Sequence, residues 1–156
     1  MCEPWNRGGV MSEDSIVGRR LWLLVLLELA VAVGIVGYWT CFYSVGAPSL
    51  ICAHLGDGYL MYERAFPVAD CLLCLALILG VIGLLRRRAF GLILSIAAGG
   101  ALVFLGVLDA TFNLTNGVYA LGICEGVVNA LMNLACVASG MVLLWLPVRW
   151  GRTVSS

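Results

Sequence analysis

One segment, residues 63–88, most constrains what this chain can fold into. It contains a C-x-x-C motif at residues 71–74, an unbroken apolar run over residues 75–85, and three consecutive arginines, Arg86–Arg88. As a helix, residues 67–85 would be about 28 Å long, which is just enough to cross the hydrocarbon core of a bilayer. The proline that begins this stretch suits the first turn of a helix. The segment therefore predicts a membrane-spanning helix with thiols at one end and positive charge at the other.

The composition places the whole chain in the integral membrane class. Hydrophobic residues make up 62% of the 156 residues, charged residues only 12%, and the mean hydropathy is +1.03. A soluble domain of this size would be nearer half apolar and a quarter charged. All nine basic residues are arginines, and none belongs to a basic patch with interleaved aromatic residues, so nucleic-acid binding has no support. The lipid bilayer is the expected partner.

Four apolar runs predict an all-α integral membrane fold, an up-down bundle of four transmembrane helices. The expected segments are an N-terminal segment at 1–20, spans at about 21–43, 67–85, 90–112 and 118–146, an outer loop at 44–66, and a tail at 148–156. The loop halves, 49–55 and 59–66, are expected to form short helices in the membrane interface.

Small residues at near-helical spacing on two of the spans predict close contacts between helices. They are Ala30, Gly34 and Gly37 in the first span, and Gly91, Ser95, Gly99, Gly106 and Ala110 in the third.

The arginines predict the orientation of the bundle. Eight of the nine flank the start of the first span, the link between the second and third spans, or the end of the fourth. In a four-span bundle these three regions share one side, which the positive-inside rule makes cytoplasmic. The chain is therefore expected in the cell membrane with both termini in the cytoplasm.

Four cysteines are expected at the outer face. Cys41 closes the first span, Cys52 lies in the outer loop, and Cys71 and Cys74 open the second span. Positive backbone dipoles at a helix start favour the reactive thiolate, and a second thiol pair can exchange electrons by disulfide exchange. Cys71 and Cys74 are thus a candidate catalytic redox pair, with Cys41 and Cys52 as a candidate shuttle or structural pair.

At these residues the chain resembles two groups of four-span enzymes, the vitamin K epoxide reductases and the quinone-linked oxidases of the disulfide-forming pathway. The resemblance covers the loop pair, the C-x-x-C at the membrane edge and the helix count, and it implies a quinone cofactor and a thiol protein partner. The reductases, however, place the C-x-x-C at their last span. The oxidases place their other pair between spans three and four, where this chain has no cysteine. No family is therefore assigned, and Cys124 and Cys136 are explained as small buried hydrophobes.

Polar residues inside the spans form a second set of candidates. Glu125, Asn129, Asn133 and Cys136 share one face of the fourth span, and Asp109 and Asn113 share a face of the third. Ionisable groups inside a membrane usually face the bundle interior and mark a site. The polar residues are expected to line a binding pocket near the outer face. The alternatives are interhelical hydrogen bonding for the asparagines and contact with water at the helix ends for Asp109 and Glu125.

Glu28 lies deep in the first span among apolar neighbours, and no Lys or Arg inside a span can neutralise it. We expect it to be protonated or paired with an asparagine, and we include it among the candidate binding residues. A glutamate in the first span is similar to that of the small multidrug transporters, which implies proton coupling. The rest of this longer chain shows no further feature of that family.

Three functional classes follow from these patterns. The leading prediction is a small polytopic membrane protein with a polar pocket near its outer face and no recognisable catalytic machinery. The alternatives are a thiol–disulfide oxidoreductase, the only class that implies a quinone and a thiol protein partner, and a proton-coupled transporter or ligand-binding bundle. His54, Asp57, Glu63 and Cys52 have no spacing typical of metal ligands, so no metal is predicted. A homo-oligomer and an enzymatic activity are both left open.

Overall fold

The computed structural model describes residues 10–45, 56–120 and 122–154, and every regular element in these ranges is helical. The elements are α1 (Val10–Val45), α3 (Gly56–Glu63), α4 (Phe66–Leu85), α5 (Ala89–Thr115), the short 3-10 helix η1 (Val118–Ala120) and α6 (Ile123–Val154). Four helical segments are long and apolar enough to cross a membrane: Gly18–Ser44, Met61–Leu85, Ala89–Thr115 and Gly126–Pro147. The prediction of four apolar helices is therefore confirmed.

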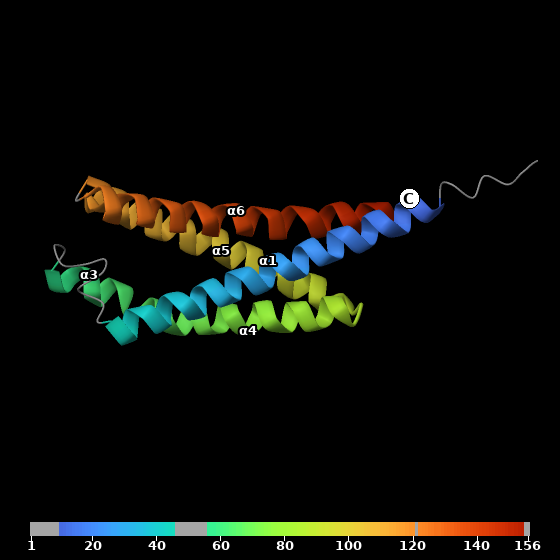
Figure 1. Ribbon diagram of the computed structural model, residues 1–156, viewed down its shortest axis with the longest axis horizontal. Helices are drawn as coiled ribbons and strands as arrows, with labels where there is room; N and C mark the ends of the chain where they lie inside the picture. Colours follow the sequence, from blue (N-terminus) through green and yellow to red (C-terminus); the bar gives the residue numbers. More distant parts are fainter. Residues whose placement is uncertain (1–9, 46–55, 121, 155–156) are drawn as a thin grey trace, which may run out of the picture.

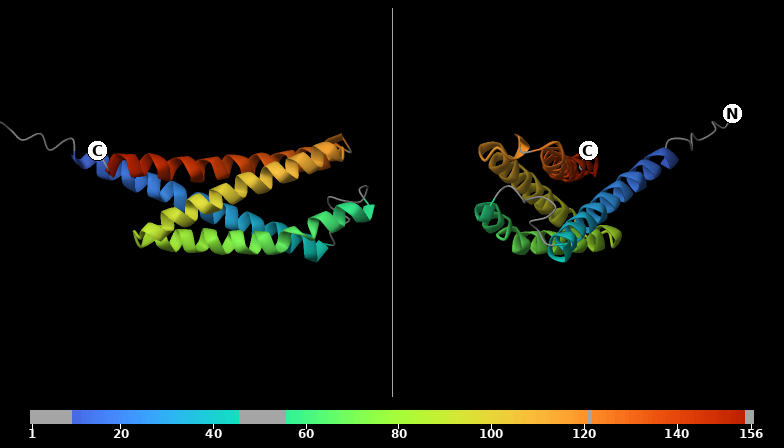
Figure 2. Two further views of the ribbon diagram at one scale, coloured as in Figure 1. Left: turned by 180° about the vertical axis from the view of Figure 1, so that it is seen from behind. Right: turned by 60° about the vertical axis from the view of Figure 1, so that its left-hand side comes forward.

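The long helices are arranged around α5, which packs against both α4 and α6, while α1 packs mainly against α4. The last turns of α1, α3, the start of α4 and the turn between α5 and α6 lie at one end of the molecule, on the left in Figure 1. We call this the α3 end. The turn between α4 and α5 and the C-terminal end of α6 lie toward the opposite end. Toward the α3 end, α1 stays beside α4 whereas α6 stays beside α5, so α1 and α6 diverge (Figures 1 and 2).

The helix boundaries differ from the predicted spans at three places. The second apolar segment starts earlier, at Met61, because α3 leads almost directly into α4. The fourth long helix starts later, at Ile123, because Gly117 adopts a positive φ of 68° and η1 follows it. Helix α6 also continues through Pro147, although its apolar segment ends there. The predicted interfacial helix at 59–66 corresponds to α3, and residues 49–55 lie outside the described residues.

Glycines on α5 bring its backbone against both neighbouring helices. A Cβ added to Gly140 of α6 would lie 2.6 Å from the carbonyl oxygen of Gly99, and one added to Gly83 of α4 would lie 2.5 Å from the Cα of Gly91. The close contact predicted for the third span is therefore confirmed. The contact predicted for the first span is wrong, because a Cβ added to Gly34 or Gly37 would meet no atom within 4 Å. No helix packs against that face of α1 in the described structure.

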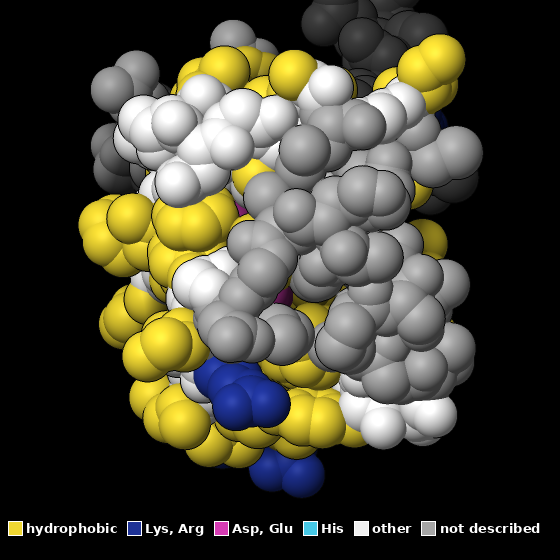
Figure 3. All heavy atoms as spheres, turned by 90° about the vertical axis from the view of Figure 1, so that its left-hand side faces the viewer, with side chains coloured by type: hydrophobic (Ala, Val, Ile, Leu, Met, Phe, Trp, Pro, Cys, Tyr) yellow, Lys and Arg dark blue, Asp and Glu magenta, His cyan; other side chains and the backbone are white. Residues whose placement is uncertain are grey.

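The buried core is narrow and includes one leucine from each long helix. Leu24, Leu77, Leu102 and Leu143 are each at most 1% exposed. Large apolar side chains cover much of the outside, and Figure 3 shows hydrophobic side chains around the described surface at the α3 end. Such a distribution suits a bundle surrounded by lipid, because lipid tails solvate exposed apolar side chains.

We expect the Gly140→Ala substitution to destabilise the protein by about 1–3 kcal/mol, because its methyl group would overlap the Gly99 carbonyl and force α5 and α6 apart. Gly100→Ala is the matched control, since its added Cβ meets no atom within 4 Å and alanine favours the helix by about 0.5–1 kcal/mol. Reversible unfolding of both variants in mixed micelles would measure the difference. Equal stability of the two variants would contradict the close α5–α6 contact.

Candidate functional site

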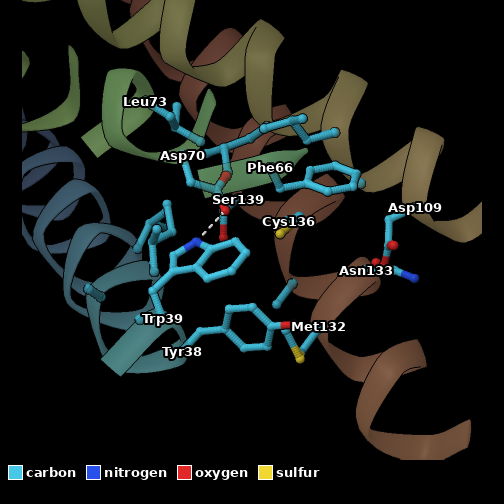
Figure 4. Close-up of a pocket in the computed structure, with 18 of the residues that line it drawn as sticks. Tyr38, Trp39, Phe66, Asp70, Leu73, Asp109, Met132, Asn133, Cys136 and Ser139 are labelled. Atoms are coloured by element: carbon cyan, nitrogen blue, oxygen red, sulfur yellow. Dashed lines mark hydrogen bonds between the residues drawn. The ribbon is translucent and has the colours of Figure 1, made fainter. Parts of the chain in front are cut away.

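A cavity of about 420 Å³ lies among the four long helices, in the half of the molecule nearer the α3 end. Its wall combines aliphatic side chains with polar and aromatic ones, and Figure 4 shows these side chains converging from α1, α4, α5 and α6. The polar and aromatic lining residues are Tyr38, Trp39, Glu63, Phe66, Asp70, Asp109, Asn129, Asn133, Cys136 and Ser139. The volume lies within the range of about 300–1,000 Å³ that is typical of sites for small molecules.

Three carboxyl groups, those of Glu63, Asp70 and Asp109, dominate the chemistry of this cavity. Glu63 is only 6% exposed, and Asp70 and Asp109 are half-buried. None of the described residues that line the cavity is a lysine, arginine or histidine. Within this described wall, the acidic groups therefore have no basic side chain to balance them.

Uncharged donors hold each of these carboxyl groups in place. Tyr38 Oη donates to the carboxyl group of Glu63 (3.1 Å), Trp39 Nε1 to that of Asp70 (2.8 Å), and Asn113 Nδ2 to that of Asp109 (3.0 Å). Figure 4 shows the Trp39–Asp70 bond inside the cavity. These donors orient the carboxyl groups but bring no positive charge.

The carboxyl groups are spread around the wall of the cavity. Among the described residues, no three His, Cys, Asp or Glu side chains are close enough to hold one metal ion. Figure 4 places Asp70 and Asp109 on separate parts of the wall, with Phe66 between them in that view. The arrangement suits a ligand large enough to fill the space between them.

The predicted pocket residues divide into three groups. Asp109, Asn129 and Asn133 line the cavity, and Asn133 donates a hydrogen bond of 2.8 Å to Tyr119 Oη. Asn113 is fully buried and contacts Asp109 without lining the cavity. The side chain of Glu125 lies outside the described residues. Binding by any of them remains a prediction.

Glu63 and Asp70 are two cavity residues that were not predicted from the sequence. Glu63 was expected in the outer loop and Asp70 at the start of the second span, whereas the structure places both in the cavity wall. Glu63 ends α3, and Phe66, Asp70 and Leu73 share one face of α4. The i, i+3 spacing of Asp70 and Leu73 inside the predicted span was the signal that could have assigned Asp70 to this face.

Glu28 lies apart from the cavity, where α1, α4 and α5 meet. It is fully buried, and neither of its carboxyl oxygens has a hydrogen-bond partner. The hydroxyl of Ser95 is nearby, but it donates to the Gly91 carbonyl oxygen at 2.8 Å. A Cβ added to Gly80 would come within 3.1 Å of Glu28 Oε2, so the glycine leaves room for the carboxyl group. The asparagine pairing expected from the sequence is not formed.

The C-x-x-C cysteines occupy different surroundings. Cys71 is exposed, whereas Cys74 is buried and its Sγ lies 3.8 Å from the carbonyl oxygen of Ala32. Cys71 is in the second turn of α4, which begins at Phe66. The dipole effect falls off within the first turn of a helix, so this argument for a reactive thiolate does not hold.

No disulfide joins any two of the cysteines that the structure describes. Among them, Cys41 is free and exposed. Cys52 lies outside the described residues. The redox roles of Cys71 and Cys74, and the shuttle or structural role of Cys41 and Cys52, remain predictions. Cys136, which the sequence placed on the same helix stripe as Asn129 and Asn133 and explained by packing, is half-buried and lines the cavity.

No protein-family model, curated protein or solved structure matches this chain. The class of protein therefore rests on the fold and the cavity. Four helices that are long and apolar enough to cross a bilayer suggest a small multi-pass membrane protein.

We expect Glu28→Met to raise the free energy of unfolding by about 1–3 kcal/mol, because the substitution removes a buried polar group without a partner and keeps a similar volume. Glu63→Met is the matched control, and it should destabilise the protein because it removes the acceptor of the Tyr38 hydrogen bond. Unfolding in mixed micelles measures both effects. A loss of stability in Glu28→Met equal to that of the control would show that Glu28 has a stabilising partner.

Proposed function

We propose that this protein is an up-down bundle with both termini in the cytoplasm that binds a small organic cation in the cavity near its extracytoplasmic face. The observation that carries the proposal is the set of three carboxyl groups, Glu63, Asp70 and Asp109, in a cavity whose described lining residues include no basic side chain.

The distribution of arginines supports this orientation. Arg19 and Arg20 lie near the start of the first apolar segment, Arg86–Arg88 form the turn between α4 and α5, and Arg149 is near the C-terminal end of α6. These positions lie away from the α3 end, where Arg64 follows α3. By the positive-inside rule, the arginine-rich end faces the cytoplasm and the cavity faces the opposite side.

Electrostatics favours a cationic ligand. An ionised carboxylate inside a membrane protein costs free energy unless a positive charge or strong hydrogen bonds compensate it. Neutral donors supply part of that compensation here, and a cation in the cavity would supply the rest. The rings of Tyr38, Trp39 and Phe66 add faces that attract cations.

The size of the cavity and the separation of its acidic groups favour an organic ion over a metal ion. Three carboxyl groups that cannot converge on one metal can still surround a larger ion of diffuse charge. The aliphatic part of the wall, which includes Leu27, Val31, Leu102 and Leu105, would contact apolar substituents of such an ion. A hydrophobic ammonium or phosphonium ion has both properties.

The test compares two ions of the same shape and opposite charge. Isothermal calorimetry with the purified full chain in lipid nanodiscs should detect saturable binding of tetraphenylphosphonium and none of tetraphenylborate. Asp109→Asn should weaken tetraphenylphosphonium binding by about tenfold, equivalent to ~1.4 kcal/mol, because one negative charge leaves the cavity.

Thr111→Val is the matched control for this experiment. Thr111 is exposed on the same helix and does not line the cavity, so its conservative substitution should leave the affinity unchanged. Equal binding of the two ions, or an unchanged affinity in Asp109→Asn, would rule out a cation site in the cavity.

Proton-coupled transport is a second candidate, favoured by the buried carboxyl group of Glu28. A group with no partner and no exposure is most stable as the neutral acid, and losing its proton would require water or a movement of α1, α4 or α5. Glu28 is also within one turn of Leu27 and Val31 on the cavity wall. Its ionisation would therefore disturb the helix that lines the ligand site.

We expect Glu28→Gln to abolish tetraphenylphosphonium flux driven by a pH gradient in proteoliposomes while leaving passive equilibration in place, because a carboxamide cannot release a proton. The wild-type chain without a gradient provides the baseline, and Thr111→Val with a gradient provides the control variant. Gradient-driven flux at the wild-type level in Glu28→Gln would exclude the proton-coupled role of this residue.

A further inference from the structure

Among the described residues that line the cavity, the exposed ones lie at one part of its wall. Most of the lining residues are buried or half-buried, and the exceptions are Ala30 and Gly34 on α1 and Ala135 on α6. Exposed lining residues mark the place where a cavity reaches the surface. The opening of this cavity therefore lies between α1 and α6.

The course of the helices explains why the bundle is open at this place. Helix α1 packs mainly on α4 and helix α6 mainly on α5, so the two diverge toward the α3 end (Figures 1 and 2). Gly34 lies on this diverging part of α1, and a Cβ added there would meet no atom within 4 Å. No described side chain fills the space beside Gly34.

The opening lies at the depth of the lipid tails. Gly34 and Ala135 are each about three helical turns, or ~15 Å, from the α3 end of their apolar segments. The hydrocarbon core of a bilayer is about 30 Å thick, so this depth is close to its middle. A molecule that passes between α1 and α6 here would come from the membrane.

The cavity is polar toward the α3 end and apolar deeper in the bundle, just as a lipid leaflet is polar at its headgroups and apolar at its tails. Its carboxyl and aromatic groups lie toward the α3 end, where Tyr38, Glu63 and Asp109 are found. Its deeper wall, with Leu27 and Leu102, is aliphatic. In a bilayer, an amphiphile holds its cationic head near the membrane surface and its apolar tail toward the middle. Such a molecule could enter the cavity in the same orientation.

We infer that the cavity takes its ligand from the membrane through the opening between α1 and α6, and that this ligand is a single-chain ammonium amphiphile of the outer leaflet. The inference rests on the proposed cation site and specifies its substrate class and route of entry. The ammonium head would lie among Glu63, Asp70 and Asp109, and the chain would follow the aliphatic wall to the opening at Gly34 and Ala135. A cavity of about 420 Å³ holds one such molecule more readily than a two-chain lipid.

The test measures entry and equilibrium binding separately. A bromine-tagged dodecylamine, which quenches tryptophan fluorescence, is mixed by stopped flow with nanodiscs that contain the full chain with Trp39 as its single tryptophan. Gly34→Phe and Ala135→Phe each place a ring in the opening from opposite helices. Both variants should slow association and dissociation by about tenfold with little change in the equilibrium constant, because an obstruction at an entrance changes both rates together.

Gly100→Phe is the matched control, since Gly100 is an equally exposed helical glycine that does not line the cavity, and its added Cβ would meet no atom within 4 Å. It should leave both rates unchanged.

If the amine quenches Trp39 but neither blocking variant changes the rates, the entrance between α1 and α6 is wrong while the cation site stands. A weaker affinity with an unchanged association rate would also overturn the entrance, because the ring would then fill the cavity. If the amine does not bind at equilibrium, the proposed cation site itself fails.

Discussion

The structure depends first on the close backbone contacts of α5. Gly99 meets Gly140 of α6, and Gly91 meets Gly83 of α4, at distances that leave no room for a side chain. These contacts keep α4, α5 and α6 together as a compact unit. Helix α1 packs mainly against α4, and its divergence from α6 toward the α3 end leaves room for the cavity.

The acidic residues of the bundle occupy two different environments. Glu63, Asp70 and Asp109 share a cavity in which uncharged side chains orient each of them. Glu28 does not line the cavity, its carboxyl oxygens have no hydrogen-bond partner in the described structure, and Gly80 leaves room for them. A carboxyl group that has hydrogen-bond donors and faces a cavity is suited to binding a ligand, whereas one enclosed by packed helices is suited to holding a proton. The two proposed roles follow from this difference in surroundings.

Particular residues show how far the sequence predicted the site. Asp109, Asn129 and Asn133 were expected in one pocket because helical spacing places their side chains toward the bundle interior, and all three line the cavity. Glu63 and Asp70 were not expected there, because Glu63 was placed in the outer loop and Asp70 was treated only as a residue of the helix start, yet both line the cavity. The thiol pair was expected at a helix terminus, but Cys71 lies in the second turn of α4. The arrangement of α3 and α4 around the cavity, which spacing along the chain does not give, therefore brought Glu63 and Asp70 into the site.

The sequence by itself determined the four apolar helices, because long runs without charge have no other stable arrangement of their backbone polar groups in a bilayer. It also indicated the α5 contact, since small residues at helical spacing allow backbones to approach. Only the tertiary structure decided that Ala30 and Gly34, which form an equally suggestive stripe, border a cavity instead of a helix interface. The reason is that a small residue permits close packing but does not require it, and the path of the partner helix decides between contact and open space.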